Sequence, residues 1–439
     1  MQTASKKVIN GWAMFDWANS VYNLVITTTF FPIYFTAVAK NAEGSNTVTF
    51  LGRNFVNSSL YNYCLALAYL LIAIAYPIVT SVADTRGNKK NFMRFFTIMG
   101  SLGCSALFFF KGIDTLGLGI VAFMLAAMGF VGSLVFYNAY LPEIAAPEDR
   151  DRISAKGFSY GYIGSVIMQL IGFALVTLMP DKGFAIRLTF LLVGIWWFGF
   201  AQITFARLPK IDRAALKKVN VFTDGFYKIK YVFGEVGKLP VLKRFLRAFF
   251  FYSMGVQTVM LAATLIGSQL LGLSETKLIV TVVLIQIVAI AGAILISRLS
   301  EKYGNMQVLI GLVIFWVIIC IAGYFTAQFK ENGGDPEYGF YGLAIGVGLI
   351  MGGIQSLSRS TYSKLMPETK ETSSFFSYYD ITEKIAIVIG MFSFGYITEI
   401  SGMKNSLLAL IVFFGIGFIF LITALCKQEQ LKIVEGIGN

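Results

Sequence analysis

The sequence contains no histidine, and only four of its 439 residues are cysteine. Histidine is the most common metal ligand and the usual proton shuttle near neutral pH, so the simplest basis for a metal site or a general base is missing. The cysteines have no paired or metal-like spacing and are expected to be packing residues. They are Cys64, Cys104, Cys320 and Cys426. We therefore expect no enzyme activity, no catalytic residues, no metal and no cofactor.

Charged residues are also scarce, at 14% of the chain against roughly 25% in soluble proteins, while 56% of the residues are hydrophobic. A water-soluble fold could not cover that much apolar surface, so the composition predicts a polytopic membrane protein. Apolar runs long enough to cross a core about 30 Å thick predict twelve helical spans and an all-α fold. The predicted spans are residues 11–36, 60–82, 92–110, 117–141, 157–179, 186–206, 245–271, 277–298, 306–328, 339–361, 374–399 and 405–426.

Lysine and arginine are distributed unevenly between the predicted loops. If the N-terminus is cytoplasmic, the outside loops hold only eight of the chain's 36 basic residues. These are Lys40, Arg53, Lys111, Lys182, Arg187, Lys277, Lys330 and Lys404. The positive-inside rule then predicts that both termini face the cytoplasm. The net charge of +12 is assigned to contact with anionic membrane lipids, and no nucleic-acid binding is expected. No cleaved targeting segment is evident, and we expect a monomer in a bacterial inner (plasma) membrane.

The longest hydrophilic interval, residues 207–244, divides the chain into residues 1–206 and 245–439, with six predicted spans on each side. Aromatic and aliphatic residues recur at helical spacing within it. They are Phe222, Phe226, Ile229 and Phe233. An amphipathic helix on the inner leaflet and a partly ordered basic linker explain this interval equally well.

Short motifs recur between these two parts at nearly one offset along the chain. An acid followed three residues later by glycine appears after the second and eighth spans, and two further motifs recur in corresponding loops. The pairs are Asp84–Gly87 with Glu301–Gly304, Pro142–Glu143 with Pro367–Glu368, and Phe158–Tyr160 with Phe376–Tyr378. The agreement predicts a duplicated six-helix unit, an architecture common among transporters.

These features resemble the major facilitator superfamily. The loop after the second span matches its D-x-x-G-x-[KR]-[KR] pattern through Asp84, Gly87, Lys89 and Lys90, although Ser81 stands where glycine is usual. GWAMFDWANS at 11–20, GGIQSLSR at 352–359 and FFSYYDITEK at 375–384 resemble the autophagy-related vacuole effluxer family. The resemblance implies two pseudo-symmetric six-helix bundles around a path that opens alternately to each side. It also implies efflux of an amino acid or similar metabolite.

The first span carries polar residues in an otherwise apolar segment. Asp16, Asn19, Asn23 and Thr27 follow at positions that share one face of an α-helix. An intramembrane carboxylate costs about 2.5–3.5 kcal/mol, which favours a functional role. We expect the deeper Asn19 and Asn23 to contact the substrate. Asp16 lies nearer the inner interface, where a gate and a latch to a neighbouring helix are both compatible with its position.

The eleventh span carries Asp380, Glu383 and Lys384 at spacings that place them on one helix face or its edge, and the tenth carries Arg359. One interpretation is structural, with Arg359 paired to Asp380 and Lys384 paired to Glu383. The other is a coupling site, where protonation of Glu383 or Asp16 releases a cation for the substrate. Further path candidates are Tyr137, Asn138, Gln257, Gln355 and Tyr379, and the gate or coupling candidates are Asp16, Asp84, Gly87, Lys89, Lys90, Glu301, Gly304, Arg359 and Asp380.

The sequence thus predicts a secondary transporter for a small solute, with protons as the candidate coupling ion. No G-x-x-x-x-G-K-[ST] pattern occurs, which argues against direct drive by ATP. A facilitator or a drug or metabolite exporter of the same fold is the alternative. A channel is disfavoured by the duplicated bundle, and a membrane enzyme by the lack of histidine. The substrate, the direction of transport and the coupling ion stay open at this stage.

Overall fold

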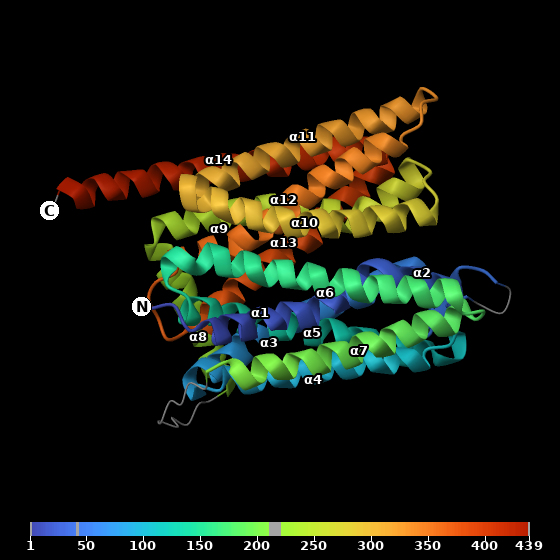
Figure 1. Cartoon of the computed structure of the whole chain (residues 1–439), viewed down its shortest axis with the longest axis horizontal. Helices are drawn as coiled ribbons and strands as arrows, with labels where there is room; N and C mark the ends of the chain where they lie inside the picture. The colour runs from blue at the N-terminus through green and yellow to red at the C-terminus, as the bar shows by residue number, and fades with distance from the viewer. Residues whose placement is uncertain (1, 41–43, 210–220, 438–439) are drawn as a thin grey trace.

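A computed structural model of the chain describes residues 2–40, 44–209 and 221–437. Within these residues, twelve helical segments are long and apolar enough to cross a membrane, which confirms the predicted number of spans. They run roughly parallel to one another, and both chain termini lie at the same end (Figure 1). We call that end the termini side. The opposite end, which carries a short β-hairpin at residues 47–56, is called the hairpin side.

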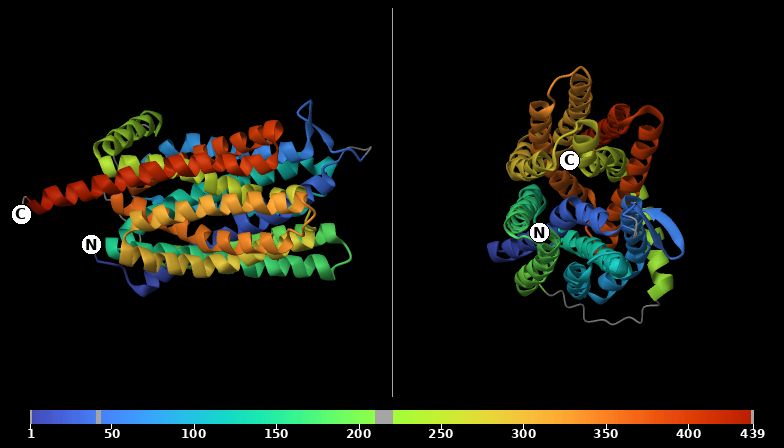
Figure 2. Two further views of the ribbon diagram at one scale, coloured as in Figure 1. Left: turned by 90° about the horizontal axis from the view of Figure 1, so that it is seen from above. Right: turned by 90° about the vertical axis from the view of Figure 1, so that its right-hand side faces the viewer.

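The helices form two groups (Figures 1 and 2). The first group is α1 (Lys6–Val21) with η1 (Tyr22–Phe30) and α2 (Phe31–Val38), α3 (Asn57–Arg86), α4 (Lys89–Ala106), α5 (Leu116–Ile144), α6 (Arg150–Leu178) and α7 (Lys182–Arg207). The second group is α9 (Pro240–Leu265) with η5 (Ile266–Leu270), α10 (Glu275–Tyr303), α11 (Asn305–Glu331), α12 (Glu337–Leu365), α13 (Thr372–Ser401) and α14 (Met403–Ile437). Three single turns of 3₁₀-helix lie at residues 107–109, 113–115 and 147–149.

Several helices are longer than their apolar runs predicted. α6 begins at Arg150 rather than at residue 157, and α14 continues past residue 426 to Ile437. A hydropathy pattern ends where charges begin, but a helix continues wherever those charges find water or partners. At the start of α6 they find partners, since Arg150 donates to the carbonyl oxygen of Ser363 on α12.

The first span is not one regular α-helix. It is α-helical to Val21 and π-helical from Tyr22 to Phe30. Because a π-helix has a wider turn than an α-helix, the expectation that Asp16, Asn19, Asn23 and Thr27 share one α-helical face is wrong beyond Val21. Irregular backbone of this kind is often found at functional sites.

The hairpin side carries a feature that hydropathy did not predict. Strands β1 (Thr47–Phe50) and β2 (Arg53–Val56) pair antiparallel, with Thr47 opposite Val56 and Phe50 opposite Arg53. Leu51 and Gly52 join them with φ angles of 49° and 75°, as a tight hairpin turn requires. Asn57 then ties the hairpin to α2, because its amide donates to the carbonyl oxygen of Ala39 at 2.8 Å.

Part of the predicted linker is helical. α8 (Val221–Lys238) packs against α3, α13 and α9, with Val232 and Val236 buried. Lys228 forms an ion pair with Glu371, just before α13. The helix therefore lies on the protein across both groups. The predicted apolar positions Phe222, Phe226 and Ile229, and the basic residues Arg213, Lys217 and Lys218, lie outside the described side chains.

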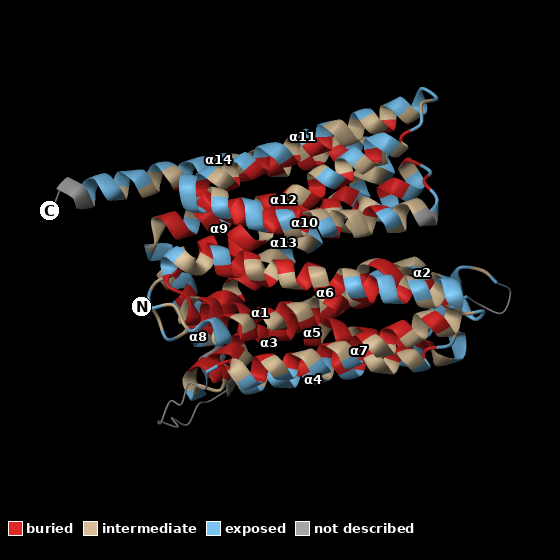
Figure 3. Cartoon of the chain, in the orientation of Figure 1, coloured by how far each residue is buried: buried red, intermediate tan, exposed pale blue. Residues whose placement is uncertain are grey.

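Buried residues concentrate where helices face one another, and exposed ones cover the outer surfaces (Figure 3). Within the groups, α4 packs closely on α5, and α14 on α9. Glycine permits the closest approaches: a Cβ on Gly129 would lie 2.3 Å from the Cα of Gly100. The two groups meet where α6 contacts α10 and α12, and where α13 contacts α3 and α5. Polar side chains gather along these inter-group seams.

Candidate functional site

Arg359, on α12 of the second group, lies at the centre of an inter-group hydrogen-bond network that we call the Arg359 hub. Its side chain is 4% exposed. Nε donates to Oγ of Ser154 and Nη2 to the Ser154 carbonyl oxygen, both at 2.9 Å. Nη1 lies 3.3 Å from Oδ1 of Asn138 and 3.4 Å from Oδ2 of Asp16. One guanidinium thus joins α12 to α1, α5 and α6.

Aromatic rings enclose the same guanidinium. Its central carbon lies 4.4 Å from the ring centroid of Phe158, 4.9 Å from that of Trp12 and 5.3 Å from that of Tyr137. Trp12 and Tyr137 stack on each other, with centroids 4.4 Å apart. Planar, weakly hydrated guanidinium suits such a cage better than a lysine ammonium would. The cage excludes water from the ion pair between Arg359 and Asp16.

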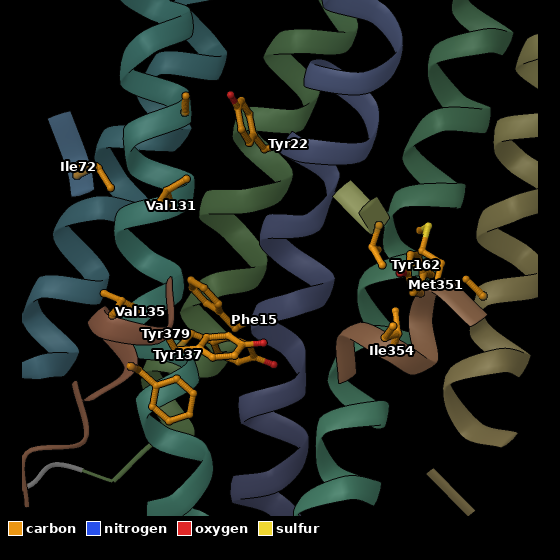
Figure 4. Packing of buried hydrophobic residues seen from close by; sticks show 14 of the residues in the cluster. Phe15, Tyr22, Ile72, Val131, Val135, Tyr137, Tyr162, Met351, Ile354 and Tyr379 are labelled. Carbon is orange, nitrogen blue, oxygen red and sulfur yellow. The ribbon is translucent and has the colours of Figure 1, made fainter. Parts of the chain in front are cut away.

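Asp16 is held on the other side of this ion pair by Tyr137, whose hydroxyl donates to Oδ2 at 2.7 Å. Figure 4 shows Tyr137 beside Phe15, with the ring centroids 5.1 Å apart. A Cβ on Gly157 of α6 would lie 2.6 Å from that same carboxylate oxygen and 2.7 Å from the Tyr137 hydroxyl. The absence of a side chain at Gly157 is what lets α6 approach α1 here. Asp16 is therefore a buried inter-group contact in this conformation.

The structural interpretation paired Arg359 with Asp380, and the structure does not form that pair. Arg359 points toward α1 and α6, and Oδ1 of Asp380 instead accepts from the Asn138 amide at 3.5 Å. Asn138 offers its oxygen to Arg359 and its nitrogen to Asp380, so a neutral amide links the two charges. The second oxygen of Asp380 is buried with no hydrogen-bond partner among the described residues.

The same interpretation paired Lys384 with Glu383, and the structure does form this pair. Nζ of Lys384 lies 2.8 Å from Oε2 of Glu383, and the side chains are 12% and 21% exposed. Gln257 on α9 donates to the other carboxylate oxygen at 3.1 Å. The ammonium lies 5.6 Å from the ring centroid of Tyr69 on α3. The Glu383–Lys384 pair is thus less enclosed than the Arg359 hub.

At the termini side, Asp84 connects the end of α3 to the start of α13. Its oxygens accept from the backbone N–H of Ser373 at 3.2 Å, and from the N–H and hydroxyl of Ser374 at 2.8 and 2.7 Å. A carboxylate at a helix N-terminus satisfies donors that the helix leaves free and suits its positive end. Gly87 ends α3 with φ of 65°, a left-handed conformation that favours glycine, which positions this turn.

The two lysines of the same turn, Lys89 and Lys90, have different partners. Lys89 pairs with Glu143 on α5 and donates to Oγ1 of Thr372 at 2.6 Å, so it too joins the first group to α13. Lys90 donates to the carbonyl oxygen of Leu208 at 2.8 Å, at the end of α7. Of the two lysines, the structure brings Lys89 to the inter-group seam.

The corresponding turn of the second group is built differently from the prediction. Glu301 is exposed, and Gly304 adopts φ of 90° between α10 and α11. The buried carboxylate at this turn comes from the other group: Asp151 on α6. Asp151 accepts from Ser300 Oγ at 3.0 Å, Asn305 Nδ2 at 2.8 Å and Lys364 Nζ at 2.6 Å.

Sequence reasoning missed Asp151 because it lies in a charged stretch outside the predicted fifth span. The internal repeat offered a usable signal for this region. It makes the start of α6 correspond to the start of α13, and the start of α13 is where Asp84 forms its contact. Two buried carboxylates therefore tie opposite groups together at the termini side. We call them the Asp84 contact and the Asp151 contact.

The remaining path candidates belong neither to the Arg359 hub nor to the Glu383–Lys384 pair. Asn19 is fully buried, and neither its amide oxygen nor its nitrogen has a partner among the described residues, whereas Asn23 is partly exposed. Gln355 accepts from the Tyr162 hydroxyl at 3.2 Å, across the groups. Tyr379 stacks on Phe249 with centroids 4.3 Å apart, inside the second group. Figure 4 shows Tyr162 lying against Met351 and Ile354 of α12.

A metal site is not apparent in the part of the chain that the structure describes, where no group of three or more cysteine, aspartate or glutamate side chains gathers. The carboxylates are committed instead to arginine, lysine, amide and hydroxyl partners. The chemistry that this arrangement offers is the breaking and remaking of ion pairs and hydrogen bonds between two helical groups.

Comparison with known proteins defines the class of protein. The chain superposes on the human organic anion transporter MFSD10 with a TM-score of 0.72, at 11% identity, covering 96% of this chain and all of that one. It is 30% identical over 421 residues to an uncharacterized MFS-type transporter, YxiO, of Bacillus subtilis, covering 94% of this chain and 93% of the relative. The protein is a transporter of the major facilitator type, and not an enzyme.

A family model identifies a narrower group within this class. The family described as "Vacuole effluxer Atg22 like" matches residues 4–430, and the chain belongs to it. Autophagy-related protein 22 of Eremothecium gossypii is 26% identical over 446 residues, covering 90% of this chain and 86% of that protein. The resemblance noted in the sequence is thereby confirmed.

Proposed function

We propose that this transporter is a monomer that exports a small zwitterionic solute, such as an amino acid, by alternating access. Residues 1–206 and 245–439 would move as two bundles joined by residues 207–244. The family's description as effluxers supports the direction of transport. The opposite charges of Glu383 and Lys384, which are partly exposed, support a substrate that carries both charges.

The observation that carries this proposal is the position of the inter-group contacts. The Asp84 and Asp151 contacts lie at the ends of α3, α6, α10 and α13 on the termini side, and the Arg359 hub lies deeper along the same seam. A path between the groups cannot open to the termini side until these contacts separate. We take this structure as the state closed to the termini side, and assign that side to the cytoplasm by the positive-inside rule.

The Glu383–Lys384 pair has the chemistry to receive the substrate. A substrate carboxylate would compete for Lys384, a substrate ammonium for Glu383, and Gln257 offers a further hydrogen bond. Protonation of Glu383 would remove the charge that holds Lys384 and free it for a carboxylate. This exchange is a route by which a proton gradient could drive transport.

The test is flux in proteoliposomes that contain the purified full-length protein. Labelled neutral amino acids should cross the membrane, and faster under a proton gradient than without one. Lys384→Gln should lose this flux because the substrate carboxylate loses its cation. Lys404→Gln, an equal charge change at the hairpin side, should transport normally. Absence of amino-acid flux in the unmodified protein, or equal flux in both variants, would contradict the proposal.

A further inference from the structure

A cavity of about 390 Å³ opens at the termini side of the second group, beside the Asp151 contact. Its walls are the turn between α10 and α11, the end of α12 and the last part of α14. Its polar lining includes Lys302, Asn305, Gln307, Lys364, Gln428 and Lys432. α14 has 35 residues, about 52 Å at ~1.5 Å per residue, so its last turns extend beyond a membrane core about 30 Å thick. The cavity therefore lies at the membrane–water boundary.

The charge around this cavity is predominantly positive. Among the side chains that the structure describes, three lysines and one acid, Glu429, line it. Neither Lys302 nor Lys432 forms an ion pair with any acid whose side chain the structure describes, and the Lys302 ammonium lies 5.0 Å from the ring centroid of Tyr303. Unpaired cations around a concave surface raise the local concentration of anions. The cavity is thus suited to a small anionic group.

The third lysine connects the cavity to the inter-group seam. Lys364 Nζ donates to Oδ2 of Asp151 at 2.6 Å and to Oδ1 of Asn305 at 3.1 Å. An ammonium has three donors, so one remains for an occupant of the cavity. An anion there would draw Lys364 away from Asp151, because the two negative groups would share one cation.

We propose that this cavity binds a phosphate-bearing anion through Lys302, Lys364 and Lys432, and that the bound anion weakens the Asp151 contact. Phosphate oxygens accept several charge-assisted hydrogen bonds, which separate lysines on three helical segments are placed to supply. The anion would be the headgroup of a phospholipid in the adjoining leaflet or a free phosphorylated solute. Either would favour opening of the termini side without entering the proposed substrate path.

The test uses full-length protein in nanodiscs and compares a cavity variant, Lys302→Gln/Lys432→Gln, with a matched control, Arg298→Gln/Lys427→Gln. The control removes the same charge from the same two helices, at residues that do not line the cavity. Two probes distinguish the sources: glycerol 3-phosphate added to phosphatidylcholine nanodiscs, and phosphatidylglycerol mixed into the nanodiscs. The measurement is the shift of the thermal unfolding midpoint with increasing probe.

We expect the control to bind as the unmodified protein does, and the cavity variant to bind about tenfold more weakly, as loss of roughly 1.4 kcal/mol of binding free energy produces. A response to glycerol 3-phosphate identifies a free solute as a ligand, and a response to phosphatidylglycerol alone identifies a lipid headgroup. Equal responses of the two double variants to both probes would overturn the site. Asp151→Asn should strengthen probe binding by releasing Lys364, and unchanged or weaker binding in that variant would overturn the coupling.

Discussion

The Arg359 hub and the Glu383–Lys384 pair are both ion pairs within membrane-spanning helices, but they differ in enclosure and in what they connect. The hub joins two helical groups, is almost fully buried, and has aromatic rings around its cation. The Glu383–Lys384 pair lies within one helix and keeps a fifth of its carboxylate side chain exposed. A buried cation with several partners is suited to holding a conformation, whereas a partly exposed pair can exchange its partners for a ligand.

The largest effect is expected from breaking the hub. Arg359→Gln leaves Asp16 buried without its cation, a change that costs about 3–5 kcal/mol in other proteins. We expect a lower unfolding midpoint and a loss of transport of about 100-fold or more. Thermal unfolding and proteoliposome flux measure the two effects. Arg298→Gln, at an exposed position on α10, is the control and should change neither.

A double variant sharpens the assignment of the hub. If the ion pair accounts for the loss, Asp16→Asn together with Arg359→Gln should be more stable than Arg359→Gln alone, because no uncompensated charge is left buried. If the two residues act independently, the double variant should instead be less stable than Arg359→Gln. The difference in stability should then equal the effect of Asp16→Asn alone.

The second-largest effect is expected at the Glu383–Lys384 pair and concerns the coupling of transport to a proton gradient. Glu383→Gln should abolish accumulation driven by a pH gradient, while exchange of substrate across a membrane at equal pH survives. Asp16→Asn should impair both activities in parallel, because the structure places Asp16 in the inter-group hub. The measurement compares counterflow with gradient-driven uptake for each variant. Gradient-driven accumulation by Glu383→Gln at the normal level would place proton coupling elsewhere.

The third effect compares the two carboxylates at the termini side. Asp84→Asn and Asp151→Asn each keep the shape of the side chain but weaken its charge-assisted hydrogen bonds, by about 1–2 kcal/mol. Each should slow transport by about tenfold while leaving membrane insertion intact. Spin labels on α4 and α11 should report a larger population open at the termini side. Normal turnover in both variants would remove these contacts from the gating mechanism.

The smallest effect is expected in the first span, as a difference in thiol reactivity between cysteines at positions 19 and 23. In a background without the four native cysteines, Asn23→Cys should react with a small water-soluble thiol reagent, because Asn23 is partly exposed. Asn19→Cys should react more slowly, because Asn19 is fully buried in this conformation. Substrate should change the rate at Asn23. Equal inertness at both positions, in variants that still transport, would make the polar residues of this span purely structural.

The sequence predicted the number of spans, the family and most of the polar residues of the Arg359 hub, because apolar runs and intramembrane charges are local signals. It did not predict which charges meet. One interpretation paired Arg359 with Asp380, but the direction in which a helix faces its neighbours depends on packing, and here α12 turns Arg359 toward α1 and α6. Asp151 was missed for a related reason: its burial depends on partners from the other group, which no local pattern reveals.

The most direct test of the account is a cross-link that holds the termini side closed. Thr80 on α3 and Ser377 on α13 line one small space beside the Asp84 contact, and neither takes part in that contact. With cysteines at both positions in a background without the native ones, a short thiol cross-linker should join the two groups. The account predicts that cross-linked protein stops transporting and that cleavage of the linker restores flux, with either single cysteine unaffected. Full transport by the cross-linked protein would contradict alternating access through this seam.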